Sequence, residues 1–114
     1  METVQVRRDE FNMALVDAID QSICDLVGQK VLNTMHTVLM KRFDIPRDEI
    51  PCRLESFQRI LTETFGLRGC ATITRVIARR FYDRLDLRYD DLQGFSLMDY
   101  VQIAKNRLAQ RERS

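Results

Sequence analysis

Apolar side chains recur every three or four residues along most of this chain, the spacing that places them on one face of an α-helix. Residues 10–27 show the pattern first, and Asp9 precedes them as a favourable N-cap. A second stretch follows Gly28 and reaches Phe43. Pro46 lacks a backbone N–H and restricts the residue before it, so the second helix is predicted to end at Phe43.

The same spacing continues on both sides of Gly66 and predicts helices over residues 55–65 and 68–85. Gly66 is expected to adopt the left-handed conformation that closes a helix. Ser96 is predicted to cap a fifth helix, with Asp99 as the acidic partner of a capping box. The pattern therefore predicts an all-α fold, a compact bundle of about five helices around a single core.

The length of 114 residues predicts one domain covering residues 1–114. Residues 1–8 leave three alternatives open: a flexible arm, a short strand over Thr3–Val6, or an extension of the first helix. Residues 95–114 form the C-terminal helix, and its apolar seam can pack on its own domain or on a second subunit. A homodimer is expected, with the last helix and the first as its candidate interface, because so small a chain with long amphipathic helices at both ends has spare apolar surface. The seam consists of Leu97, Val101, Ala104 and Leu108.

Charge is balanced overall but unevenly distributed. The net charge of +1 argues against a general nucleic-acid-binding protein, which normally shows a strong basic excess. Residues 1–50 carry six Lys or Arg against nine Asp or Glu, a net charge of −3, whereas residues 51–114 carry twelve against eight, a net charge of +4. Two interpretations stay open: complementary surfaces within the fold, or a basic face on the C-terminal half for an anionic partner.

The fourth predicted helix carries the strongest candidate surface. Its five arginines are Arg68, Arg75, Arg79, Arg80 and Arg84. At about 100° per residue, the first three lie within about 40° of one another and share a face, and the last two form an i,i+4 pair. The simplest interpretation is a solvated face paired with acids such as Asp83. The alternatives are a surface for an anion or acidic partner, or for DNA or RNA.

Residues suited to metal binding or catalysis show no recognisable spacing. His36 is the single histidine and lies on the apolar side of its helix, which favours a structural role. Cys24, His36, Cys52 and Cys70 could supply a zinc site, but zinc sites usually contain close cysteine pairs. No nucleophile, base or carboxylate pair is recognisable, so neither an enzyme nor a bound cofactor is predicted.

The location of the protein is predicted from cysteines and hydropathy. The first ten residues lack the apolar region of a secretory leader, and no run of about 18 apolar residues is present, so no membrane segment is expected. Three widely spaced cysteines indicate reduced thiols. Reduced thiols in turn predict a cytoplasmic protein.

Residues 38–87 combine an apolar pattern with proline and glycine turns. The pattern consists of Leu39, Phe43, Ile45, Glu49-Ile50-Pro51, Phe57, Leu61, Phe65-Gly66, Gly69, Ala71, Ile73, Ile77, Phe81-Tyr82, Leu85 and Leu87. It resembles the NitrOD5 family, small helical output domains found mainly in archaeal signalling-related and stand-alone proteins. Pro46 and Cys70 depart from the usual pattern of that family. The resemblance implies a regulatory or interaction role in the cytoplasm, and no catalytic residues carry over.

The residues and the resemblance together predict a small non-enzymatic regulatory or signal-output domain that acts through protein–protein contacts as a homodimer. Two alternatives stay open. One is a nucleic-acid-binding regulator that uses the five arginines of the fourth helix. The other is a sensor of a small ligand or metal, built around His36 and the cysteines.

Overall fold

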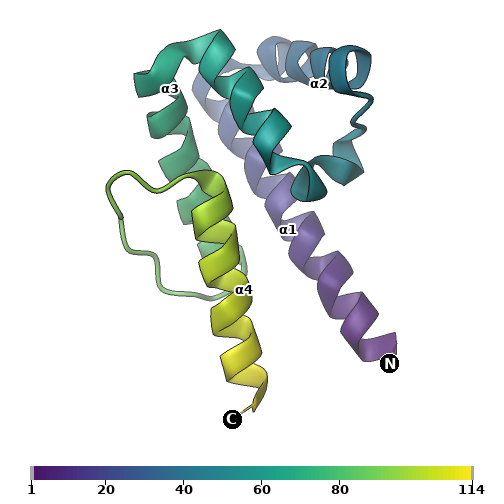
Figure 1. The fold of residues 1–114 in the computed structure, drawn as a ribbon, viewed down its shortest axis with the longest axis vertical. Coiled ribbons are helices and arrows are strands. Elements are labelled where there is room, and N and C mark those ends of the chain that lie inside the picture. Colours follow the sequence, from purple (N-terminus) through teal and green to yellow (C-terminus); the bar gives the residue numbers. More distant parts are fainter. Residues whose placement is uncertain (1, 114) are drawn as a thin grey trace.

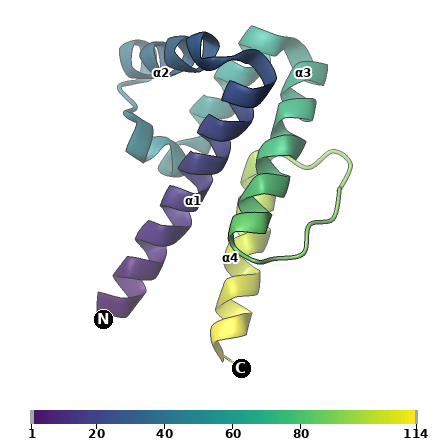
Figure 2. The same ribbon diagram turned by 180° about the vertical axis from the view of Figure 1, so that it is seen from behind.

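The computed structural model describes the backbone of residues 2–113 and the side chains of residues 9–111. Within this range it contains four α-helices and one 3-10 helix and no strand, so the all-α prediction is confirmed. The elements are α1 (Glu2–Val27), α2 (Gln29–Phe43), η1 (Arg47–Cys52), α3 (Leu54–Arg84) and α4 (Leu97–Arg113). Figures 1 and 2 show α2 crossing one end of α1, with α3 and α4 beside α1. None of the described helices is both long enough and apolar enough to span a membrane.

All five helices contribute to one hydrophobic core, as the amphipathic pattern predicts. Phe11 of α1 meets Phe81 of α3 edge to face, with ring centroids 5.1 Å apart, which ties these two helices together. Completely or almost completely buried members from the five helices include Leu15, Leu39, Ile50, Phe81 and Ala104. The bundle is therefore closed by side chains that lie far apart in the sequence.

The end of α2 matches the prediction at Phe43. Asp44 adopts the left-handed conformation, with φ 56° and ψ 43°. Its N–H donates to the carbonyl of Met40 at 3.0 Å, and the N–H of Ile45 donates to the carbonyl of Leu39 at 3.2 Å. These bonds satisfy two carbonyls that the helix end leaves free. The segment predicted as a break after this end contains the short helix η1.

The two predicted N-caps had different outcomes. The capping box before α4 is confirmed, because Ser96 N–H donates to Asp99 Oδ2 at 2.9 Å and Asp99 N–H donates to Ser96 Oγ at 3.2 Å. Asp9 is not an N-cap, because α1 begins at Glu2. Of the alternatives for the segment before Asp9, the structure shows the extension of the first helix, so the strand over Thr3–Val6 was wrong, and the flexible arm stays a prediction.

Two glycines form the corners of the fold. Gly28 separates α1 from α2 with φ 100° and ψ 160°, and Gly66 bends α3 with φ 77° and ψ 176°. A positive φ combined with an extended ψ is essentially restricted to glycine. The left-handed conformation expected for Gly66 was therefore wrong in ψ. The helices predicted over 55–65 and 68–85 are two halves of α3, which rises to this corner and descends again (Figure 1).

Candidate functional site

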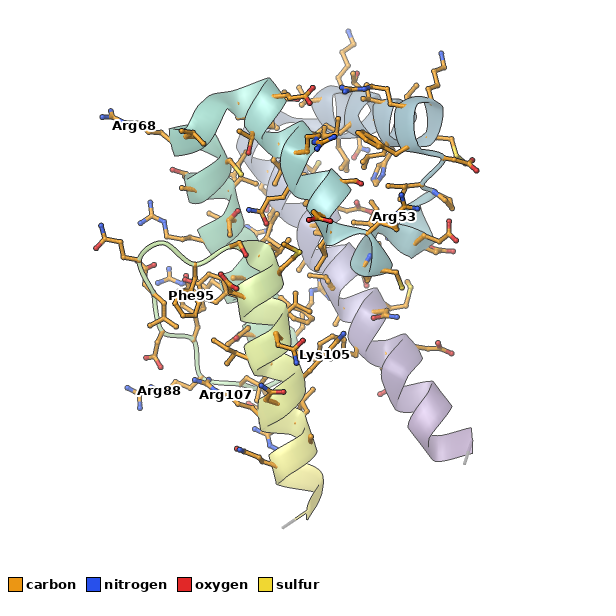
Figure 3. The ribbon with its side chains drawn as sticks, in the orientation of Figure 1. Arg53, Arg68, Arg88, Phe95, Lys105 and Arg107 are labelled. Atoms are coloured by element: carbon orange, nitrogen blue, oxygen red, sulfur yellow. The ribbon has the colours of Figure 1, made fainter. Side chains whose placement is uncertain are left out.

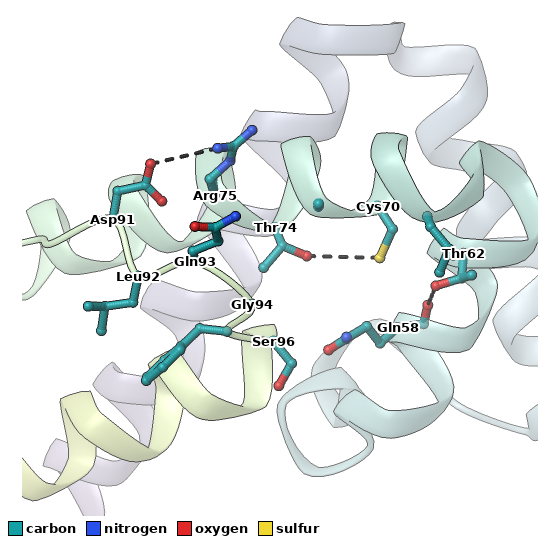
Figure 4. Close-up of a pocket in the computed structure, with 13 residues that line it drawn as sticks. Gln58, Thr62, Cys70, Thr74, Arg75, Asp91, Leu92, Gln93, Gly94 and Ser96 are labelled. Carbon is teal, nitrogen blue, oxygen red and sulfur yellow. Dashed lines mark hydrogen bonds and ion pairs between the residues drawn. The ribbon is translucent and has the colours of Figure 1, made fainter.

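A groove of about 590 Å³ lies between the two halves of α3 and the loop that precedes α4 (Figure 4). Residues 91–96 form its loop wall. The α3 side is lined by Gln58 and Thr62 before the corner and by Leu67, Cys70, Thr74 and Arg75 after it. The Gly66 corner therefore creates the groove, because it turns the second half of α3 back toward the first.

The groove has a mixed lining, in which the apolar side chains of Leu67, Leu92 and Phe95 stand beside polar ones such as Arg75, Asp91 and Gln93. Leu67 is 80% exposed and Phe95 is 39% exposed. Cys70 and Thr74 lie buried at the floor, with the thiol sulfur 4.0 Å from the hydroxyl oxygen. This lining favours contact with apolar groups and offers a few polar groups for orientation.

Tyr100 of α4 holds the loop wall in place. Its hydroxyl accepts a hydrogen bond from the N–H of Leu92 at 2.9 Å and donates to the carbonyl of Leu92 at 3.1 Å. Its ring contacts Tyr89 and Phe95, with centroids 5.6 Å and 5.7 Å away. Burial raises the pKa of Tyr89, and its hydrogen bond to Tyr100 raises that pKa further, so the Tyr89 phenol stays protonated. The wall is thus fixed although it has no regular secondary structure.

A second hollow, of about 380 Å³, continues along the outer face of α3. It shares Arg75 and Asp91 with the groove. Arg75 Nη1 lies 3.7 Å from Asp91 Oδ2, so this ion pair is the boundary between the two hollows (Figure 4). Beyond the pair, the guanidinium of Arg79 sits over the ring of Tyr89, 5.6 Å from its centroid.

Two of the five predicted arginines turn toward α1. Arg80 Nη1 lies 2.7 Å from Asp25 Oδ2, and Arg84 Nη2 donates to Gln21 Oε1 at 2.7 Å. The carboxylate that pairs with Arg80 is therefore Asp25 of α1, not the Asp83 suggested by helical spacing. These contacts join the basic C-terminal half to the acidic N-terminal half, as the complementary-surface interpretation of the charges expects.

The other three arginines stay exposed on one face of the second half of α3. Arg68 projects outward from the corner (Figure 3), and no carboxylate among the described side chains is within ion-pair distance of it. Arg75 and Arg79 follow at the two hollows. Of the face predicted for these three arginines, Arg75 lines the groove and Arg79 lines the second hollow, whereas Arg68 lies at the corner outside the lining of both. The use of this face in binding stays a prediction.

The apolar seam of α4 belongs to the core of its own chain. Leu97 and Ala104 are fully buried, Val101 is 5% exposed, and Leu108 packs against the core. The seam therefore leaves little surface for a second subunit, and the homodimer interface through these four residues stays a prediction. Heptad-like spacing alone does not distinguish packing within a chain from packing between chains.

His36 takes part in a charged cluster between three helices. Its Nε2 lies 2.9 Å from Asp20 Oδ1 of α1, while Nε of Arg47 in η1 donates to Asp20 Oδ2. Because Asp20 accepts from Nε2, the neutral ring carries its proton there and leaves Nδ1 without a partner among the described atoms. The zinc set weighed from the sequence does not assemble, since no group of three or more suitable side chains in the described part of the chain is placed around a metal position.

This cluster predicts sensitivity to acid. Burial raises the pKa of Asp20, but hydrogen bonds from His36 and Arg47 outweigh it and hold the pKa below its ordinary value of 3.8. A carboxyl group whose pKa is lowered on folding stabilises the protein above pH 3.8, and this contribution disappears as the pH falls through the lowered pKa. Asp20→Asn should therefore lower the free energy of unfolding by about 1–2 kcal/mol at pH 7, after allowance for partial exposure. The difference from the unmodified protein should shrink as the pH falls.

The measurement is urea unfolding followed by circular dichroism from neutral pH to about pH 2. Asp48→Asn is the matched control. Asp48 pairs with the same Arg47, but the pair is long, at 3.8 Å, and Asp48 is 83% exposed, so it should contribute little to stability. The acid sensitivity of this variant should equal that of the unmodified protein. If the free energy of unfolding of Asp20→Asn fell as steeply with acid as that of the unmodified protein, Asp20 would not be the source of the acid sensitivity.

Comparison of the chain with protein-family models, curated proteins and solved structures gave no match. The NitrOD5 resemblance thus stays a prediction that rests on residues 38–87.

Two groove residues were missed by the sequence reasoning. Leu67 falls between the helices predicted over 55–65 and 68–85, and Phe95 was placed at the start of the C-terminal helix. Neither was given a role. No usable signal marked Leu67, because at about 100° per residue it lies on the same apolar stripe as Phe81 and Leu85, and only its place at the corner leaves it exposed. No signal marks Phe95 either, since its position depends on the path of the loop.

Proposed function

We propose that this protein is a small non-enzymatic regulatory domain that holds a protein partner in the groove between the halves of α3 and residues 91–96. The observation that carries the proposal is the 80% exposure of Leu67, with Phe95 on the opposite rim. Burial of such a side chain contributes about 1.5–3 kcal/mol, and a groove that combines apolar side chains with a few polar ones suits a bound partner. The NitrOD5 resemblance points to the same class of function.

The two alternatives have less support. Three of the five arginines, Arg75, Arg80 and Arg84, lie within 4.0 Å of carboxylates of this chain, and nucleic-acid phosphates would compete with those contacts. A sensor centred on His36 would have to reach its buried Nδ1, since Nε2 is already held by Asp20. Neither alternative explains the exposed Leu67.

Affinity purification from native cells tests the proposal with three forms of the protein. Leu67→Asp places a charge at the rim, and Met40→Asp makes the same change at a 48% exposed residue of α2 that does not line the groove. A specific partner should be retained by the unmodified protein and by Met40→Asp, and lost by Leu67→Asp at unchanged thermal stability. Retention of the same proteins by all three forms would contradict the proposal.

A further inference from the structure

The groove and the second hollow form one track along the second half of α3. Leu67 lies at its first end and Arg79 at its other end, twelve residues on, which corresponds to about 18 Å of helix. The only feature that both hollows share is the pair of Arg75 and Asp91, whose side chains are 53% and 56% exposed. A pair this exposed and 3.7 Å long contributes little to stability and can open easily.

One border of this track is basic and not neutralised. Arg68 and Arg79 have no carboxylate partner among the side chains that the structure describes, and Arg75 has only the long contact with Asp91. These three exposed arginines share a face that lies about 80–120° around the helix from Leu67, so the basic face runs beside the apolar rim. The track therefore combines apolar groups with a positive border, which fits a partner that is both apolar and acidic.

The shape of the partner follows from the secondary structure. An extended peptide usually docks by adding a strand to an open sheet edge, and residues 2–113 contain no strand. A helix satisfies its backbone hydrogen bonds internally, so it can dock where no such edge is present. A helix laid in a groove between helices is a common mode of recognition in all-α proteins.

On the basis of the proposed protein-binding function, we infer that the groove takes an acidic amphipathic helix of a partner protein. Apolar side chains of that helix cover Leu67 and Phe95. Its carboxylates pair with Arg68 and Arg79 at the two ends of the track. In the middle of the track, a carboxylate of the partner replaces Asp91 as the ion-pair partner of Arg75. Opening of the Arg75–Asp91 pair joins the two hollows.

Two synthetic helices test the inference directly. The first is a peptide of roughly 14 residues with leucines at positions i, i+3 and i+7 and glutamates on both flanks, about the length of the track. The second has lysine in place of each glutamate. Fluorescence anisotropy gives the affinities, and amide chemical shifts of the labelled protein locate the binding site. The glutamate peptide should bind at the groove about tenfold or more tightly than the lysine peptide.

Three variants assign the binding to particular residues. Arg68→Glu combined with Arg79→Glu should weaken the glutamate peptide about tenfold, and Leu67→Asp should weaken both peptides. Lys41→Glu, an exposed change on α2 outside the track, should have no effect beyond that of the altered net charge. All of these positions are exposed, so the variants should fold normally.

Several results would overturn the inference. Equal affinity for both peptides would show that the groove has no preference for an acidic helix. The proposed protein-binding function would still stand, since it is tested separately by purification with Leu67→Asp. The inference would also be overturned if the glutamate peptide did not bind. Tighter binding of mixed-sequence DNA, weakened by the same arginine substitutions, would overturn it as well. So would a dimer in sedimentation that Leu67→Asp dissociates, because a second copy would then occupy the groove.

Discussion

Replacement of Tyr100 by alanine should lower the free energy of unfolding by about 3–5 kcal/mol, the usual loss for removing a buried aromatic ring. Tyr100 is 1% exposed and its backbone carbonyl accepts the Tyr82 hydroxyl at 2.7 Å. Its ring lies against Tyr82, Tyr89 and Phe95, with centroids 5.6–6.1 Å away. The substitution therefore empties the space between α4, α3 and the loop wall of the groove.

Tyr100→Phe separates the ring from the hydroxyl. It keeps the packing and removes both hydrogen bonds to Leu92, so it should cost only about 1–2 kcal/mol, while the amide of Leu92 exchanges faster with solvent. Urea unfolding gives the two stabilities, and hydrogen exchange reports on the loop. If Tyr100→Phe lowered the free energy of unfolding as much as Tyr100→Ala, the hydroxyl rather than the packed ring would be the main contribution of Tyr100 to stability.

The second large effect is expected at the corner of α3. Gly66→Ala should destabilise the protein by about 1–3 kcal/mol, because φ 77° with ψ 176° is a conformation that residues with a Cβ rarely adopt. The loss comes from the backbone alone, since no atom lies within 4 Å of a Cβ added there. If α3 relaxes toward a straight helix, the two walls of the groove separate and peptide binding should fall as well.

Two other glycines provide the comparison for Gly66→Ala. Gly94 also has a positive φ, of 82°, with open space around it, so Gly94→Ala should be destabilising without changing α3. Gly69→Ala should be destabilising for a different reason, a steric clash, because the added Cβ would lie 2.7 Å from the Cβ of Phe65. Urea unfolding measures all three. A Gly66→Ala variant as stable as the unmodified protein would contradict the role assigned to its φ.

Features that depend on neighbouring residues were predictable from the sequence. The end of α2 follows from Phe43 and the nearby Pro46, and the cap of α4 follows from the spacing of Ser96 and Asp99. Each involves residues a few positions apart, where capping chemistry determines the backbone. The all-α fold follows from periodicity in the same way.

Features that depend on distant residues were not predictable. Arg80 pairs with Asp25 at a separation of 55 positions, so helical spacing could suggest only the nearer Asp83. The glycine at position 66 signalled a turn, but several positive-φ conformations suit glycine, and only ψ decides whether a helix stops or bends. The groove needs that bend together with the path of residues 91–96, and neither leaves a pattern in the sequence.

The two hydrogen bonds between Tyr100 and Leu92 have a consequence for the order in which the protein becomes able to bind. The residue that secures the loop wall lies in α4, after the loop itself. A growing chain can complete α1, α2 and α3 before Tyr100 has been synthesised, and during that time the groove has only its α3 side. A partner that recognises both rims would therefore distinguish the finished protein from a nascent or truncated one.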